Sequence, residues 1–122
     1  MKKRVPETEL QILKSLWDSQ PSTVRQTVEA VYGEHSQSLH TTVKSLLERL
    51  IEKGLVVADR SLRPHTFSST ISREAYANDQ VSHIASQLFG GDVVPMLQSL
   101  VGQVKLSPED KATIEEILGE LE

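Results

Sequence analysis

The 122 residues suit one ordinary domain, or a small domain with a helical appendage, and they exclude two large domains. Apolar residues make up 38% of the chain and aromatic residues 4%, which predicts a modest core of leucine, valine and isoleucine rather than a disordered chain. The absence of cysteine excludes a disulfide framework and a thiolate metal site, and it is compatible with a reducing cytoplasm.

The formal net charge of −4 is divided unevenly along the chain. Residues 1–73 hold 11 Lys or Arg against 8 Asp or Glu, a net charge of +3, whereas residues 74–122 hold 2 against 9, a net charge of −7. This asymmetry favours one half that faces a polyanion and another that is kept away from it. The alternative is accidental surface composition.

The first residues have the positive charge of a signal peptide but not its apolar segment. Pro6, Glu7 and Glu9 stand where that segment would have to be. The longest apolar stretches are also far shorter than a membrane span. We therefore expect a soluble, unexported protein of the cytoplasm with no membrane partner.

The first predicted element is an amphipathic helix over about residues 6–18, because apolar residues recur there at helical spacing and Pro6 suits a first turn. Its expected buried stripe is Leu10, Leu13, Leu16 and Trp17. We assign Trp17 to the core rather than to base stacking, because it follows Leu13 and Leu16 on that stripe.

A second helix is predicted after Pro21. Thr23 and Gln26 stand at the spacing of a capping box, with Ser22 as the alternative N-cap, and Gly33 is a suitable stop. The expected buried stripe of this helix is Val24, Val28, Val31 and Tyr32.

A third helix is predicted from about Leu39 to Lys53, closed by Gly54. Its apolar side is Leu39, Val43, Leu46, Leu47 and Leu50. The opposite side carries Thr41, Ser45, Glu48 and Glu52, flanked by Thr42, Lys44 and Arg49. We expect this exposed face to read bases, with Glu48 and Glu52 towards the C-terminal half and pointing away from the floor of the groove.

The periodicity changes after Gly54. Residues 55–59 are apolar and β-branched, residues 60–64 form a turn-like break, and residues 65–70 alternate around Phe67. This pattern predicts a β-hairpin with a basic tip. Three helices followed by such a hairpin are typical of a winged helix-turn-helix, whose third helix enters the major groove of DNA. We therefore expect a mainly α fold with a small β-hairpin, in which residues 1–71 form a winged-helix DNA-binding domain.

Residues 72–122 are expected to form a helical dimerisation domain. Gly90-Gly91 ends its first helix, Asp92 caps a short second helix and Ser107-Pro108 begin a third. So short a segment cannot enclose three apolar stripes, so we expect pairing with a second copy and a preference for a palindromic site. The interface candidates, some of which must be intrachain core, are Val81, Ile84, Leu88, Leu97, Leu100, Val101, Ile114, Ile117 and Leu121.

The third helix and the hairpin carry the residue types that duplex binding needs, which are cations for phosphates and short polar side chains for base edges. The expected groove-facing residues are Thr41, Thr42 and Ser45. The expected contacts to phosphates or to the minor groove are Arg25, His40, Lys44, Arg49, Arg60, Arg63 and His65. For each of these residues the alternative is ordinary surface or packing.

Six segments, in this order and at this spacing, carry a resemblance to a known family. They are Leu10–Trp17 (LQILKSLW), Ser22–Val31 (STVRQTVEAV), Thr41–Val56 (TTVKSLLERLIEKGLV), Ser72–Tyr76 (SREAY), Phe89-Gly90-Gly91 and Lys105–Leu118 (KLSPEDKATIEEIL). The chain resembles the penicillinase repressor family, which includes regulators of β-lactamase and methicillin resistance and copper-transport repressors. The resemblance implies a winged-helix head, a helical dimerisation region and repression of transcription from a pseudo-palindromic operator.

The chain also departs from this family in three places. In some relatives a sensor metalloprotease leads to cleavage of the repressor between Asn and Phe. The aligned dipeptide here is Ser99-Leu100, which argues against induction by cleavage in this chain. A sensor protease nevertheless remains an open alternative as a partner. Copper-responsive relatives carry a cysteine cluster, so thiolate copper sensing is excluded. The wing tip, residues 61–64, lacks the usual Gly-containing turn.

Nothing in the sequence indicates catalysis. It has no Gly-rich phosphate loop, no paired histidines at metal spacing and no recognisable nucleophile setting, so we expect no enzyme, no cofactor and no metal. The alternative to a DNA-binding repressor is a winged-helix protein-interaction adaptor that does not bind DNA. Salt-sensitive binding to a duplex distinguishes the two.

Overall fold

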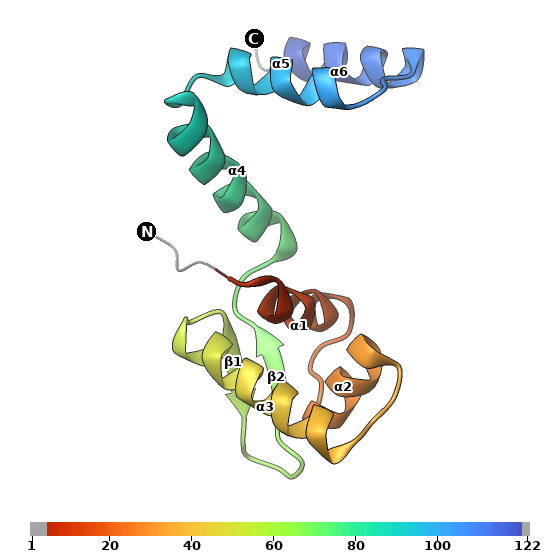
Figure 1. Ribbon diagram of the computed structural model, residues 1–122, viewed down its shortest axis with the longest axis vertical. Coiled ribbons are helices and arrows are strands. Elements are labelled where there is room, and N and C mark those ends of the chain that lie inside the picture. The colour runs from red at the N-terminus through yellow and green to blue at the C-terminus, as the bar shows by residue number, and fades with distance from the viewer. Residues whose placement is uncertain (1–4, 121–122) are drawn as a thin grey trace. The chain divides into compact units, whose positions relative to one another are not determined.

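The computed structural model describes residues 5–120. Within that range the chain forms α1 (Glu7–Asp18), α2 (Val24–Tyr32), α3 (Gln37–Glu52), β1 (Val56–Asp59), β2 (Thr66–Ser69), α4 (Arg73–Phe89), α5 (Val93–Gln103) and α6 (Pro108–Glu120) (Figure 1). The predicted mainly α fold with a small β-hairpin is therefore confirmed. The chain divides within α4 into two compact units, Met1–Asp79 and Gln80–Glu122, and we describe each by itself.

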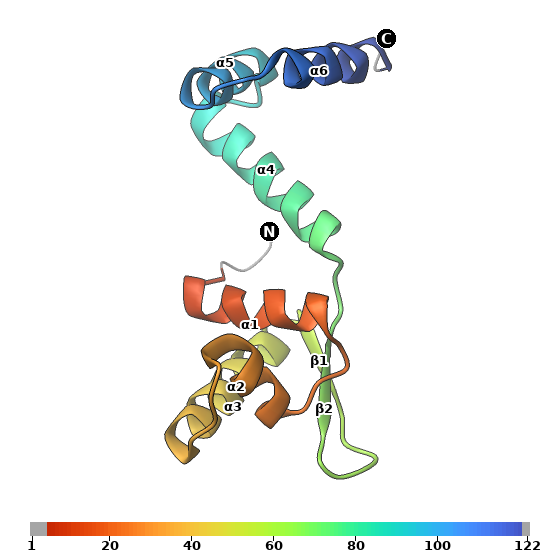
Figure 2. The same ribbon diagram turned by 90° about the vertical axis from the view of Figure 1, so that its right-hand side faces the viewer.

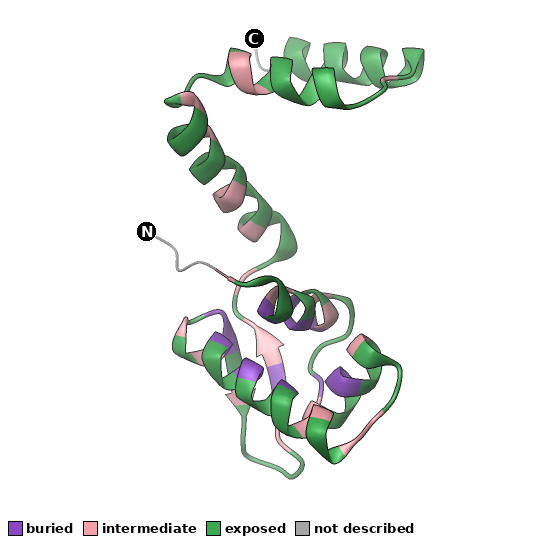
Figure 3. Ribbon diagram, viewed as in Figure 1, coloured by how far each residue is buried: buried purple, intermediate pink, exposed green. Residues whose placement is uncertain are grey.

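The first unit has one core, enclosed by α1, α2, α3 and the hairpin. Figure 3 shows the buried residues in these elements, and Figure 2 shows the hairpin loop extending beyond the helices, on the side away from α1. The core residues are Ile12, Leu13, Leu16, Val28, Val43, Leu46, Leu47, Leu50, Leu55, Val56 and Phe67. Burial of each such side chain contributes roughly 1.5–3 kcal/mol, so this cluster holds the three helices against the hairpin.

The predicted capping box at the start of α2 is confirmed. The Thr23 hydroxyl accepts from the Gln26 amide at 3.1 Å, and the Gln26 side chain accepts from the Thr23 amide at 2.9 Å. The predicted burial of Tyr32 is wrong, since this side chain is 40% exposed. The buried face of α2 is centred towards Thr27 instead, whose hydroxyl donates to the Thr23 carbonyl and is thereby satisfied inside the protein.

The helix α3 begins two residues before the predicted start at Leu39. Ser36 is its N-cap, and the Ser36 hydroxyl accepts from the Leu39 amide at 3.1 Å. The apolar stripe therefore indicates which part of α3 contacts the core, whereas the N-cap Ser36 indicates where the helix starts.

The end of α3 agrees with the prediction. Gly54 adopts a left-handed conformation with φ of 78°, which suits a residue without Cβ. Its amide donates to the Ile51 carbonyl, and the Leu55 amide donates to the Leu50 carbonyl at 3.0 Å. These two bonds form a Schellman motif that turns the chain from α3 into β1, with Leu55 buried behind it.

The hairpin is a two-stranded antiparallel sheet in which Val56 pairs with Ser69 and Asp59 with Thr66. We call β1, β2 and the connecting residues 60–65 the wing. Phe67 on β2 is buried and also exchanges backbone hydrogen bonds with Ser22, at 2.8 and 3.1 Å. This bridge fastens the start of α2 to the wing.

Trp17 packs against the core as predicted, although it is only partly buried. Its indole N–H donates to the Ile71 carbonyl at 2.9 Å and to the Ser69 hydroxyl at 3.1 Å. Its ring lies 5.7 Å from that of Tyr76. Trp17 thus joins α1 to the segment that leaves the wing and to the first turns of α4.

A buried ion pair joins α1 to the end of α3. The Lys53 ammonium lies 2.6 Å from the Glu9 carboxylate, and Glu9 as a whole is only 2% exposed. The sequence pattern did not predict this pair, because a charged residue within a helical stretch is normally assigned to the exposed face.

The second unit consists of the rest of α4 with α5 and α6. The predicted starts are confirmed: Asp92 accepts from the Val94 amide, and the Ser107 hydroxyl accepts from the Asp110 amide. In contrast to the first unit, none of the described residues of α4, α5 and α6 is buried. Across residues 5–120, no helix combines the length and the apolar character that a membrane crossing requires.

Candidate nucleic-acid interface

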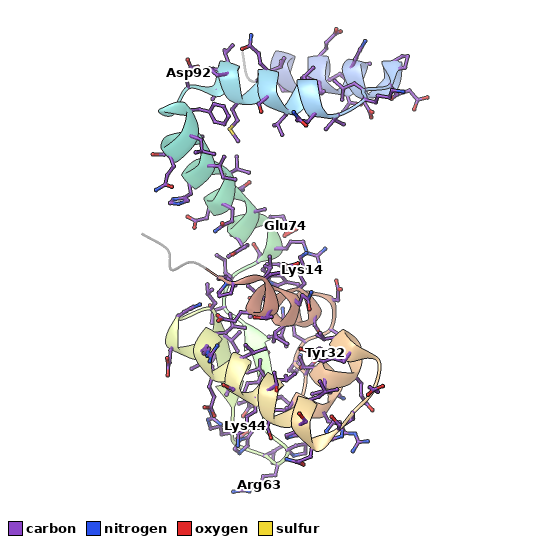
Figure 4. All side chains as sticks on the ribbon, in the orientation of Figure 1. Lys14, Tyr32, Lys44, Arg63, Glu74 and Asp92 are labelled. Carbon is purple, nitrogen blue, oxygen red and sulfur yellow. The ribbon has the colours of Figure 1, made fainter. Side chains whose placement is uncertain are left out.

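A hollow of about 570 Å³ lies between the start of α2, the exposed face of α3 and the wing. Figure 4 shows Lys44 on α3 and Arg63 on the wing at the same end of the first unit. The hollow is lined by Thr23, Val24, Arg25, His40, Lys44, Glu48, Arg60, Arg63, Pro64, His65 and Phe67. We call it the α3–wing hollow.

The hollow brings together six of the ten residues that the sequence indicated as DNA contacts. They are Arg25, His40, Lys44, Arg60, Arg63 and His65. Four are always cationic near neutral pH and the other two are histidines, while Glu48 is the one carboxylate among the lining residues. This balance makes the hollow attractive to a polyanion such as a phosphate backbone.

The other four predicted contacts lie on α3 outside the hollow, and all four are exposed. They are Thr41, Thr42, Ser45 and Arg49. The Thr41 hydroxyl donates to the Gln37 carbonyl at 3.0 Å, so its oxygen presents lone pairs outward. An oxygen held in this way can accept a hydrogen bond from a base amino group.

Both histidines of the hollow have fixed partners. His40 Nδ1 lies 3.0 Å from Nε2 of His35, and the two rings meet edge to face at 82°. Arg60 donates to His65 Nδ1 at 3.2 Å, so the free N–H of His65 is at Nε2. These contacts hold both imidazole rings in place at the edge of the hollow.

The turn at the tip of the wing is held by a carboxylate. Asp59 accepts hydrogen bonds from the Ser61 amide at 2.9 Å and from the Ser61 hydroxyl at 2.6 Å. These bonds, together with the nearby His65, lower the pKa of the Asp59 carboxyl. Asp59 therefore stays ionised and keeps the turn ordered to lower pH than an ordinary aspartate would.

Five of the lining residues are not among the predicted DNA contacts. They are Thr23, Val24, Glu48, Pro64 and Phe67. Thr23, Val24 and Phe67 meet there because of the backbone bridge between Ser22 and the wing, a contact between distant parts of the chain that no local pattern signals. Glu48 was predicted on the exposed face of α3, but it was expected to point away from the floor of the groove because it lies towards the C-terminal half of the helix.

The nine predicted interface residues belong to the second unit. Eight of them lie in the described region, and each is 36% to 73% exposed. Leu121 lies outside the described residues. No group of three or more metal-ligating side chains occurs in residues 5–120.

Comparison with known proteins finds a family that covers nearly the whole chain. The sequence profile described as "Penicillinase repressor" matches residues 5–120. Two curated relatives, both named "Transcriptional regulator BlaI", come from Mycobacterium tuberculosis strains CDC 1551 / Oshkosh and ATCC 25618 / H37Rv. Each is 33% identical over 72 residues, which cover 58% of this chain and 51% of the relative. The match thus spans about half the length of these relatives.

Among solved structures, the chain is similar to a MarR family transcriptional regulator from Silicibacter pomeroyi DSS. The sequence identity is 23% and the TM-score 0.48, with coverage of 97% of this chain and 69% of that one.

Proposed function

Because the chain belongs to the penicillinase repressor family, we propose that it is a homodimeric transcriptional repressor that binds a pseudo-palindromic DNA operator through α3 and the wing. In this proposal residues 1–71 bind DNA and residues 72–122 form the dimer. The single observation that carries it is the α3–wing hollow, where cations from three separate elements face one space.

The hollow suits the sugar-phosphate strand that separates two grooves of a duplex. With α3 in the major groove, this strand passes between α3 and the wing, and the wing then reaches the adjacent minor groove. Lys44 and Arg25 contact the strand from the helices, and Arg60 and Arg63 contact it from the wing. Such phosphate contacts supply affinity and orientation but no sequence selection.

Sequence selection falls to the exposed residues of α3 beside the hollow. Thr41, Thr42 and Ser45 are short, polar and exposed, so they approach base edges without a large loss of side-chain entropy. A hydroxyl bonds with several base edges, and a threonine methyl packs on the methyl group of thymine.

The dimer is supported by the uncovered apolar side chains of the second unit. A helix with an apolar stripe gains stability only when another surface covers that stripe, and none of the described residues of α4, α5 and α6 is buried by its own chain. A second copy presents the same stripes and buries both sets at once. The two-fold symmetry of that dimer presents two copies of α3 to the DNA and so favours a palindromic site.

Selection of bound sequences from random duplexes tests the proposal. We expect enrichment of an inverted repeat whose half-sites are separated by one helical turn of DNA or a multiple of it. Affinity for the selected duplex should fall steeply as the salt concentration rises, because each phosphate contact releases counterions. Enrichment of no sequence, together with no duplex binding at low ionic strength, would refute the repressor and leave the protein-interaction adaptor in its place.

A further inference from the structure

The α3–wing hollow contains one residue whose charge opposes that of DNA. Glu48 lines the hollow one helical turn after Lys44, among Arg25, Arg60 and Arg63. Despite these neighbours, within the described part of the chain the Glu48 carboxylate makes no ion pair and no hydrogen bond. The three ion pairs that do form there involve other carboxylates, on Glu9, Asp18 and Glu29.

An unpaired carboxylate at a surface that receives phosphates weakens binding by like-charge repulsion. From its place in the C-terminal half of α3, Glu48 was expected to point away from the floor of the groove, and in the structure it lines the hollow beside Lys44. Glu48 also follows Thr41 by seven residues, which is two turns, so both lie on the same face of α3. The carboxylate therefore faces the same groove as the expected base-reading hydroxyls.

A carboxylate accepts hydrogen bonds but donates none, so it requires a donor on the DNA. In the major groove guanine presents two acceptors, and thymine presents an acceptor beside a methyl group. Adenine presents an amino donor directly beside the N7 acceptor, which repels a carboxylate. Cytosine alone presents the N4 amino donor with no acceptor on the same base edge.

We propose that Glu48 determines specificity by accepting a hydrogen bond from the N4 amino group of one cytosine in each operator half-site, while its charge disfavours duplexes that lack this cytosine. The inference rests on the proposed function, since it assumes that α3 lies in the major groove. The surrounding cations retain the phosphate strand, so the carboxylate costs affinity mainly where no cytosine amino group meets it.

The chain offers a matched control on the same helix. Glu52 is exposed one turn after Glu48 on the same face of α3, but it does not line the hollow. Random-duplex selection is therefore run on four versions of the 122-residue chain, namely the parent, Glu48→Ala, Glu48→Gln and Glu52→Gln. Enrichment at the other positions of the half-site shows in the same experiment that each variant folds and binds.

We expect the parent and Glu52→Gln to enrich cytosine at one position of each half-site, and Glu48→Ala to lose that preference. Glu48→Gln should shift it towards adenine, because a glutamine amide bonds both N6 and N7 of that base. On the selected operator, replacing this C·G pair by T·A should weaken binding of the parent by about 5- to 10-fold per half-site, and that of Glu48→Ala by less than about 2-fold.

Two negative results have different meanings. If the parent enriches no inverted repeat, the proposed function fails and this inference fails with it. If the parent enriches an inverted repeat and Glu48→Ala keeps every base preference of the parent, the repressor stands and the role of Glu48 is overturned.

Discussion

Replacing Lys53 by Met removes the ammonium group that lies 2.6 Å from the buried carboxylate of Glu9. With an effective dielectric constant of about 20, Coulomb's law gives roughly 6 kcal/mol of attraction at that distance, most of which offsets the desolvation of the two ions. After the substitution the desolvation of Glu9 remains and the attraction is lost. Breaking such a pair costs about 3–5 kcal/mol, and we expect the lower end because the Lys53 side chain is 19% exposed and water can replace it.

The assay is urea unfolding followed by the fluorescence of Trp17, which reports on the first unit through its contacts with Ser69 and Ile71. A loss of about 3 kcal/mol, at a typical slope of about 1–3 kcal/mol per molar urea, lowers the midpoint by roughly 1–3 M. Lys14→Met is the matched control, because Lys14 is exposed on α1 and its replacement should change the free energy of unfolding by less than about 0.5 kcal/mol.

A double variant separates the charge effect from lost packing. Adding Glu9→Gln to Lys53→Met removes the uncompensated charge, so the double variant should be more stable than Lys53→Met alone. If Lys53→Met unfolds at the same urea concentration as Lys14→Met, the reasoning is refuted and the ion pair does not hold α3 against α1.

Three further predictions concern the first unit and the dimer. Lys44→Ala should weaken binding to every duplex and reduce the slope of log affinity against log salt concentration by about one unit. An unchanged slope would show that Lys44 does not contact a phosphate. Thr23→Ala removes half of the capping box and should cost about 1 kcal/mol, or roughly 4–8 °C in melting temperature, so an unaltered melting curve would contradict this role. Leu100→Asp should sediment as a monomer, whereas Leu62→Asp, at an exposed position of the wing, should stay dimeric; a dimer of Leu100→Asp would remove Leu100 from the interface.

The helix boundaries show which structural features a local sequence pattern can predict. The capping box at Thr23, the positive φ at Gly54 and the N-caps Asp92 and Ser107 all lie where the sequence predicts them. Each involves hydrogen bonds or backbone strain within a few residues, so the neighbouring sequence suffices to specify it. The start of α3 was predicted less well, because Ser36 precedes the apolar stripe on which the prediction relied.

The sequence predicted which types of residue form the candidate site, but it did not predict the full set of residues that line the hollow. Basic residues on α3 and at the wing tip followed from spacing and charge, and six of the ten predicted contacts share one hollow. Phe67 and Val24 joined them only in three dimensions, because the bridge between Ser22 and Phe67 sets the wing against α2. That bridge consists of backbone groups, which are alike in every residue and leave no mark in a sequence.

The sequence by itself determined the number and order of the elements, their caps and the uneven distribution of charge, since these depend on side chains that interact over one or two helical turns. Only the tertiary structure decided that Glu9 is buried against Lys53, that Tyr32 stays exposed and that Glu48 faces the cationic hollow. Burial and charge pairing depend on which distant surface covers a side chain, and helical periodicity states only which face of a helix that side chain occupies.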